Sequence, residues 1–173
     1  MEKTPLTILK YGESILKKQA CSVTAFDERL LELIQKMIQT MHLAPGVGLA
    51  APQVGEPLQL ATVDTSIGQD ASELLVLINP RLIESDPACL TEEEGCLSLP
   101  GYALPVERHA RIVVSAIDLE GREAVHEFRD FKARVVQHEI DHLSGTLIID
   151  RVSNLKRALI KQEIKRLAKS GKW

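Results

Sequence analysis

His138-Glu139-Ile140-Asp141-His142 is the stretch that organises both the fold and the chemistry of this chain. On a helix, residues i and i+4 lie on the same face, so His138 and His142 can offer two nitrogen atoms to one metal ion. Glu139 then projects beside the metal without having to bind it. Two neutral nitrogen ligands and a carboxylate that can take a proton from water are parts of a metal-dependent hydrolase. The third ligand must come from another segment.

Hydrophobic periodicity predicts helices and strands in mixed order. Apolar residues recur at helical spacing over 27–42 and 154–169, and the two histidines belong to a helix over 130–143. A short extended arm or strand is expected over 5–9. Strands are predicted at 58–63, 74–78, 111–117 and 123–128, with a hairpin between the last two. This order predicts an α+β fold with mixed, mainly antiparallel sheets around a central metal-binding helix, an N-terminal helix and a C-terminal helix.

Composition limits the class of protein. A chain of 173 residues with 45% hydrophobic and 26% charged residues is typical of one soluble globular domain, spanning 1–173. The first residues lack the pattern of a secretory signal, which predicts a cytoplasmic protein. The longest stretch without Asp, Glu, Lys or Arg, 37–55, contains Pro45 and Pro52, so no membrane span is expected. Three cysteines without C-x-x-C spacing predict free thiols, with Cys21 and Cys89 buried as small apolar residues.

Two protease-like arrangements could supply the third ligand. In metzincin-like proteases a third histidine follows a glycine; here Gly145 is in place, but Ile148 occupies the histidine position. In thermolysin-like proteases the third ligand is a glutamate about twenty residues further along, which here is Glu163. Lys161 and Lys165 beside it favour an ordinary ion pair on a helix surface. A thermolysin-like metallopeptidase therefore stays open as an alternative.

The remaining source is a cysteine. Cys96 follows Glu94-Gly95, and Pro100-Gly101 turns the chain shortly after it. One thiolate and two imidazoles leave a fourth position of a divalent ion open for water. A protein with a purely structural metal would instead need a fourth ligand, and the remaining histidines show no ligand spacing: His42, His109 and His126. This non-catalytic alternative also stays open.

A small, apolar segment precedes these residues. Gly46-Val47-Gly48-Leu49-Ala50-Ala51-Pro52-Gln53 ends in its one polar side chain. Its glycines allow the backbone of a bound substrate to approach closely, and the Gln53 amide can donate to a developing oxyanion. The alternative interpretation is a tightly packed turn of the core.

Together, three segments resemble the peptide deformylases, which remove the formyl group from the N-terminal methionine of new bacterial and organellar proteins. The family motif Gly-φ-Gly-φ-Ala-Ala-Pro-Gln, in which φ is an apolar residue, is matched by 46–53. The motif Glu-Gly-Cys-φ-Ser is matched by 94–98, and Gln-His-Glu-φ-Asp-His by 137–142. The resemblance covers nearly the whole chain.

The resemblance implies a role for each matching residue. One divalent ion, usually Fe²⁺ with Zn²⁺, Ni²⁺ or Co²⁺ as substitutes, would be held by Cys96, His138 and His142. Glu139 would carry the proton of the attacking water to the leaving amine. Side chains and backbone of the other matching residues would bind the N-formylmethionyl peptide. The Gln53 side chain and the Leu97 N–H would stabilise the oxyanion, Gly48 would pair with the peptide backbone, and the methionine side chain would contact Val47, Phe131 and Val135.

One departure from the family concerns how the peptide is held. Some members have a basic residue shortly after the proline at 100, whereas this chain has Tyr102 and Ala103. The nearest arginine, Arg108, is a candidate to pair with Glu94. The sequence therefore leaves open how the peptide is held beyond its methionine.

The charge is concentrated at one end. Residues 151–173 hold 8 of the 21 Lys and Arg residues but only one of the 24 Asp and Glu residues. The resemblance implies a contact between this basic helix and ribosomal RNA, near the point where the nascent chain leaves. A solvated helix face is the simpler alternative.

Overall fold

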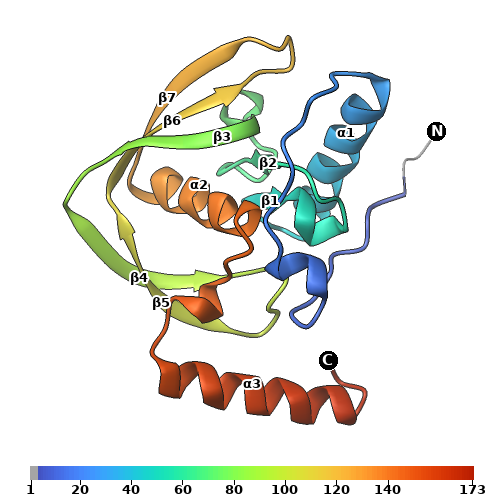
Figure 1. Ribbon diagram of the computed structural model, residues 1–173, viewed down its shortest axis with the longest axis vertical. Helices are drawn as coiled ribbons and strands as arrows, with labels where there is room; N and C mark the ends of the chain where they lie inside the picture. The colour runs from blue at the N-terminus through green and yellow to red at the C-terminus, as the bar shows by residue number, and fades with distance from the viewer. Residues whose placement is uncertain (1–3) are drawn as a thin grey trace.

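The computed structural model describes residues 4–173, and Figure 1 shows two antiparallel sheets with a helix between them. The larger sheet has five strands in the order β1-β2-β3-β6-β7, and the smaller pairs β4 with β5. The strands are β1 (Gly48–Ala50), β2 (Leu60–Val63), β3 (Leu75–Ser85), β4 (Cys89–Gly95), β5 (Ala103–His109), β6 (Arg111–Ile117) and β7 (Glu123–Arg129). The predicted α+β class with mainly antiparallel sheets is confirmed.

Three α-helices surround and penetrate this frame: α1 (Glu28–Leu43), α2 (Asp130–Leu143) and α3 (Asn154–Lys169). The last two match their predicted ranges. Helix α1 begins one residue late because the Asp27 side chain caps it, accepting a hydrogen bond of 3.0 Å from the Leu30 N–H. Four single turns of 3-10 helix complete the elements: η1 (Ser14–Lys17), η2 (Ala51–Val54), η3 (Ala71–Glu73) and η4 (Ile148–Asp150).

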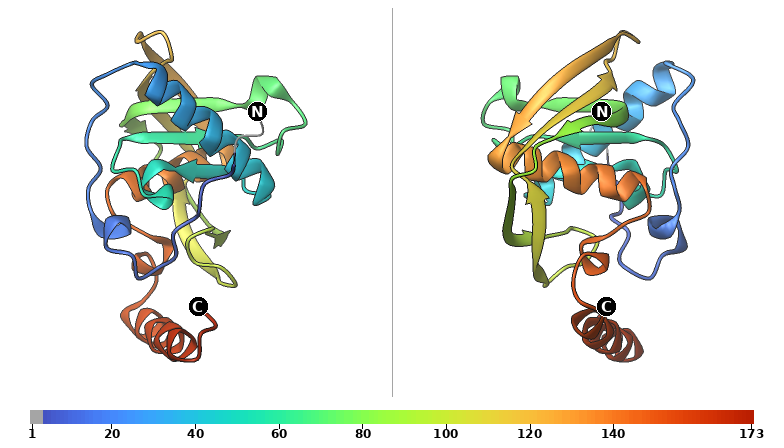
Figure 2. Two further views of the ribbon diagram at one scale, coloured as in Figure 1. Left: turned by 90° about the vertical axis from the view of Figure 1, so that its right-hand side faces the viewer. Right: turned by 60° about the vertical axis from the view of Figure 1, so that its left-hand side comes forward.

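The two faces of the larger sheet are covered by different helices. Alternate strand residues point to opposite faces, so Leu60 packs in the cluster that includes α1, whereas Val63 packs in the cluster that includes α2. Figure 2 shows α1 on the outer face and α3 below the rest of the molecule. Helix α2 is thereby enclosed between the two sheets, which places both of its histidines inside the protein.

Helix α2 is unusual because its polar side is also buried. The buried polar residues are Arg134, Gln137, Glu139, Asp141 and His142. The Gln137 amide fixes α2 against the end of β5, because it donates to the His109 carbonyl at 2.9 Å and accepts from the His109 N–H at 3.1 Å. Such bonds offset the cost of removing polar groups from water. A helix of this kind is suited to hold a reactive site rather than only a core.

Four strands differ from the sequence predictions, and the first is β1, which forms within the segment 46–53 where no strand was predicted. Strand β3 continues beyond residue 78, where the predicted strand ended. The left-handed Asn79, at φ 50°, and a register shift between Ile78 and Arg81 interrupt the ladder, so the missing N–H of Pro80 is tolerated. Strand β4 has no apolar alternation, because its Thr-Glu-Glu-Glu run is mostly exposed, and neither β4 nor its partner β5 was predicted.

The N-terminal segment 5–9 is an extended arm without a strand partner. Its Leu6 N–H donates to the Thr40 hydroxyl at 2.8 Å, and its Leu9 N–H donates to the Gln53 carbonyl at 2.7 Å. The arm therefore ends against η2. Within residues 4–173, no helix is long and apolar enough to cross a membrane.

The prediction that Cys21 and Cys89 are buried was wrong, and the apolar residues predicted at helical spacing over 154–169 are only partly covered. All three cysteines are free thiols, as expected, but Cys21 and Cys89 are exposed. On α3 the buried positions are Ile160 and Ile164, whereas Leu155 is 72% exposed. Only one edge of the predicted apolar stripe contacts the protein body, because α3 packs through a narrow face.

A buried carboxylate at the end of β2 gives a prediction for acid stability. Burial alone raises the pKa of Asp64, but hydrogen bonds from Ser66, His42 and Gly68 outweigh it and lower the pKa from 3.8 to about 2. Because the folded pKa lies below the unfolded value of about 3.9, this group stabilises the fold above that value, and the contribution is lost as the pH falls towards 2. We expect Asp64→Asn to lower the free energy of unfolding by about 2 kcal/mol at pH 7.

Urea denaturation at pH 7, 5 and 3 measures this effect. The difference between wild type and Asp64→Asn should shrink at pH 3. The matched control is Asp70→Asn, on the exposed part of the same loop. This substitution should lower the free energy of unfolding less than Asp64→Asn does at pH 7 and pH 5. A difference that stays constant between pH 7 and pH 3 would show that the carboxylate charge is not responsible.

Candidate metal centre

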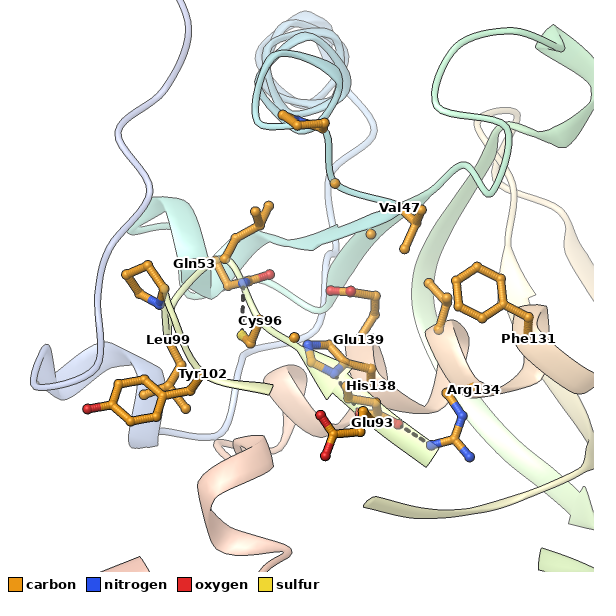
Figure 3. A pocket seen from close by; sticks show the side chains of 18 of the residues that line it. Val47, Gln53, Glu93, Cys96, Leu99, Tyr102, Phe131, Arg134, His138 and Glu139 are labelled. Carbon is orange, nitrogen blue, oxygen red and sulfur yellow. Dashed lines mark hydrogen bonds and ion pairs between the residues drawn. The ribbon is translucent and has the colours of Figure 1, made fainter. Parts of the chain in front are cut away.

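Three potential ligands from two distant segments meet beside α2. His138 and His142 lie on successive turns of α2, and Cys96 follows β4. His142 Nε2 lies 3.2 Å from His138 Nε2 and 3.3 Å from Cys96 Sγ. All three ligand atoms lie within 4.8 Å of one another. The structure therefore brings together the three residues that the sequence suggested as ligands, and Figure 3 shows Cys96 and His138 at the same cavity.

The spacing of these atoms fits one tetrahedral ion. A metal with nitrogen ligands at about 2.0–2.1 Å and a sulfur ligand at about 2.3 Å separates its ligand atoms by about 3.3–3.6 Å. The separations of 3.2 and 3.3 Å around His142 Nε2 are close to this. Within residues 4–173, the other histidines are engaged elsewhere: His42 with Asp64, His109 with the Asp86 carbonyl and His126 against Phe128. Three protein ligands leave room for water or substrate.

Glu94 orients the first histidine. Its Oε2 lies 3.0 Å from His138 Nδ1, which leaves Nε2 of the same ring for an ion. Two further bonds of 2.9 Å come from Arg108, so the suggested pairing of Arg108 with Glu94 is present. Burial raises the pKa of Glu94, but Arg108 and His138 outweigh it and lower the pKa to about 2. Glu94 therefore stays ionised at neutral pH.

Glu139 points into the same cavity from α2 (Figure 3). It is only 3% exposed, and its Oε2 has no hydrogen-bond partner among residues 4–173. Burial raises the pKa of Glu139 from 4.5 to about 7, although the charges of His138 and Arg108 oppose this. A carboxylate with such a pKa can both accept and release a proton near neutral pH.

Two residues that carry possible donors, Gln53 and Leu97, line the cavity from different segments. Gln53 Oε1 accepts the Ala50 N–H at 2.8 Å, which turns Nε2 towards Ser98 Oγ at 3.2 Å and Cys96 Sγ at 3.8 Å. Leu97 also lines the cavity, and its N–H donates to no other group in the described part of the chain. A side-chain amide and a backbone N–H are thus available to an oxygen bound between them.

The cavity has a volume of about 470 Å³. Gly46, Val47 and Gly48 form one wall, and because β1 is an edge strand of the larger sheet, one of its edges is free to pair with a peptide. Val135 is buried in the adjoining wall, whereas Phe131 is 53% exposed and lies at the rim. Val47, Phe131 and Val135, which the resemblance implied for the methionine side chain, all line this cavity.

The wall at Gly48 has no space for a side chain. A Cβ added to Gly48 would lie 2.2 Å from Glu139 Oε1. We expect Gly48→Ala to displace the Glu139 carboxylate and to lower the catalytic activity of the site by at least about tenfold, since proton transfer depends on position. Thermal unfolding of Gly48→Ala and of Gly95→Ala, where a Cβ would meet nothing within 4 Å, separates displacement from loss of fold. Unchanged activity in Gly48→Ala would contradict the prediction.

Comparison with known proteins identifies the family. The polypeptide deformylase family matches residues 5–158 of this chain. The chain belongs to the polypeptide deformylase family. A peptide deformylase from Thermodesulfovibrio yellowstonii is 46% identical over 160 residues, which cover 92% of this chain and 96% of the relative. The chain is therefore similar to this relative over almost the whole length of both proteins.

Solved structures agree with the fold of this deformylase. A peptide deformylase from Legionella pneumophila has a TM-score of 0.88 and 38% identity, covering 95% of this chain and 98% of that chain. One from Synechococcus elongatus, in complex with actinonin, has a TM-score of 0.84 and 39% identity, covering 94% of this chain and 87% of that chain.

Sequence analysis assigned no role to Arg134 or Asp141, although Asp141 belongs to the motif matched by 137–142. Arg134 Nη1 donates to Glu94 Oε1 and to the Val106 carbonyl, both at 2.8 Å. Asp141 receives Arg108 Nη1 at 2.5 Å and is also bonded by Arg151. Glu94 is therefore held in a buried network of ion pairs with Arg108 and Arg134, and Arg108 is in turn paired with Asp141. The spacing of Arg134, one helical turn before His138, could have indicated that both side chains lie on the same face of α2.

The two alternative sites are not supported. Glu163 lies on α3 with Arg166 at 3.9 Å and is outside the group of Cys96, His138 and His142. No further histidine, cysteine or carboxylate among residues 4–173 joins that group as a fourth ligand. Neither a thermolysin-like nor a purely structural metal site is formed.

Proposed function

We propose that this deformylase hydrolyses the N-formyl group of peptides that begin with formylmethionine, with residues 1–173 acting as one cytoplasmic catalytic domain. The observation that supports this most directly is that Glu139 lies in one cavity with Cys96, His138 and His142. Water attacks the formyl carbon, the C–N bond breaks, and formate and a free amine are released.

The site needs one divalent ion per chain, held by Cys96, His138 and His142. When bound, such an ion lowers the pKa of water and polarises a carbonyl oxygen. We favour Fe²⁺, and the same ligands accept Zn²⁺, Ni²⁺ or Co²⁺. Glu139 takes the proton from the attacking water and passes it to the leaving nitrogen, because its buried side chain lines the same cavity as Cys96 and His138.

The remaining residues bind and orient the substrate. The Gln53 amide and the Leu97 N–H donate to the oxygen of the tetrahedral intermediate; removing one such donor costs about 2.7–4 kcal/mol in other enzymes. The Gly48 backbone pairs with the peptide at the free edge of β1. The methionine side chain occupies the end of the cavity formed by Val47, Phe131 and Val135.

Formate release from formyl-Met-Ala-Ser by protein purified without oxygen tests the proposal. Metal analysis of the same sample identifies the ion, and acetyl-Met-Ala-Ser is the control for nonspecific amide hydrolysis. Cys96→Ala should lose both metal and activity. Formate production that is absent in fully metal-loaded protein would overturn the proposal. Thermal stabilisation by actinonin, the ligand in the Synechococcus elongatus structure, provides a test of binding that does not depend on turnover.

The basic helix carries a separate proposal, that α3 contacts ribosomal RNA. The exposed cations of α3 are Lys161, Lys165, Arg166 and Lys169, and exposed Lys172 follows the end of the helix. Binding to purified ribosomes should weaken steeply as salt rises, because counterions are released from phosphate. Replacing Lys161, Lys165 and Lys169 by glutamate should abolish binding. Binding that is insensitive both to salt and to this reversal of charge would contradict the contact.

A further inference from the structure

The end of the cavity away from the proposed methionine site is formed by Tyr102. Figure 3 shows Val47 and Phe131 on one side of the metal ligands and Tyr102 with Leu99 on the other. All four line the same cavity. If the methionine side chain occupies the first end, the second end remains for the residues that follow. Tyr102 is also the position at which this chain departs from family members with a basic residue nearby.

Trp173 packs against this tyrosine from outside the cavity. The two rings meet edge to face, with centroids 6.3 Å apart and an interplanar angle of 65°. Trp173 Nε1 donates to the Tyr11 carbonyl at 2.8 Å, and the Tyr11 N–H donates to the Ser98 carbonyl at 2.7 Å. Trp173 is therefore tied to the loop after Cys96 in two ways, through Tyr102 and through Tyr11.

Helix α3 also contacts Tyr102. The Glu163 carboxylate faces the Tyr102 hydroxyl, and burial together with this carboxylate raises the pKa of Tyr102 above its ordinary value. Ile160 and Ile164 of α3 share a hydrophobic cluster with Leu99, and Tyr102 and Trp173 pack against that cluster. Because Glu163 engages the hydroxyl, the aromatic face of Tyr102 is the part left to contact a ligand.

We propose that Tyr102 contacts the side chain of the peptide residue after the methionine, and that Trp173 and Glu163 hold its ring in that position. The inference rests on the proposed function and adds a preference to it. Contact with an aromatic face stabilises a bound apolar or aromatic side chain most, and glycine has no side chain to make this contact. The Glu93 carboxylate, which also lines the cavity, disfavours an acidic residue there. The preferred substrate is formyl-Met followed by an apolar or aromatic residue.

A double-mutant cycle between enzyme and substrate isolates this contact. Wild type and Tyr102→Ala are each assayed with formyl-Met-Phe-Ser and formyl-Met-Gly-Ser. Tyr102→Ala should raise KM for the Phe peptide about three- to tenfold and for the Gly peptide less than about twofold, with kcat retained. Trp173→Ala should shift the same ratio in the same direction. Tyr102→Phe keeps the aromatic face but loses the contact with Glu163, so it should shift the ratio less than Tyr102→Ala. Leu155→Ala is the control on α3. The Leu155 side chain is exposed and does not belong to the buried face of the helix, so its loss should change neither KM.

Trp173 also provides a direct signal, because it is the one tryptophan in the sequence. Titration with the product Met-Phe-Ser should change its fluorescence in wild type, and Tyr102→Ala should lose most of that change. Equal effects of Tyr102→Ala on both substrates, or no effect on either, would overturn the inference while formate release leaves the proposed function standing. Absence of formate release by metal-loaded wild type would instead remove the proposed function itself.

Discussion

Replacing Glu139 by glutamine is expected to lower kcat for formate release by about 10²- to 10⁴-fold, the usual contribution of a positioned acid–base group. Glutamine keeps nearly the same shape but cannot accept a proton. The carboxylate is 3% exposed, and its Oε2 bonds to no other group among residues 4–173, so structure depends little on its charge. The loss should therefore appear in kcat rather than in stability.

Three measurements accompany this variant. Metal analysis should show the same content as wild type, because Glu139 is not one of the proposed ligands. Thermal unfolding should show equal or greater stability, since a buried carboxylate has been replaced by a neutral group. Glu32→Gln on the exposed side of α1 is the matched control and should retain full activity. If Glu139→Gln retains metal and kcat, another group must carry the proton.

The central helix shows what the sequence can predict. The range 130–143 was predicted from two histidines and apolar spacing, and α2 occupies the same residues. Local pattern was sufficient because a helix is defined by its own periodicity. Cys96 was also a candidate ligand from its neighbours. Its approach to His142 at 3.3 Å, however, depends on β4, a strand that the sequence did not reveal.

The charged residues show where sequence reasoning stops. Arg134 and Asp141 resemble ordinary charged residues on a helix surface, yet Arg134 is 5% and Asp141 8% exposed. Burial of both depends on β4 and β5 covering α2, which is a long-range arrangement with no local signal. The exposure of Leu155 is the converse case, since an apolar residue at helical spacing has no partner where α3 leaves the protein body. Periodicity predicts an element, but not which of its faces is covered.

Loss of Arg108 is expected to produce the largest effect on stability. Its side chain is 2% exposed and bonds Glu94 twice at 2.9 Å and Asp141 at 2.5 Å. In Arg108→Met both carboxylates lose a buried cation, so we expect the free energy of unfolding to fall by about 3–5 kcal/mol. For a chain of this length the melting temperature should fall by about 6–20 °C. Differential scanning calorimetry of metal-free and metal-loaded protein measures both changes.

The control for Arg108→Met is Arg122→Met, which removes an arginine that also pairs with two carboxylates, those of Asp118 and Glu120. Because the Arg122 side chain is 72% exposed, water replaces its bonds, and the loss should stay below about 1 kcal/mol. Equal losses in the two variants would show that burial of the network contributes nothing. Arg108→Met should also bind metal less tightly, since Glu94 then holds His138 less firmly. A stability loss without weaker metal binding would mean that the network supports the fold alone.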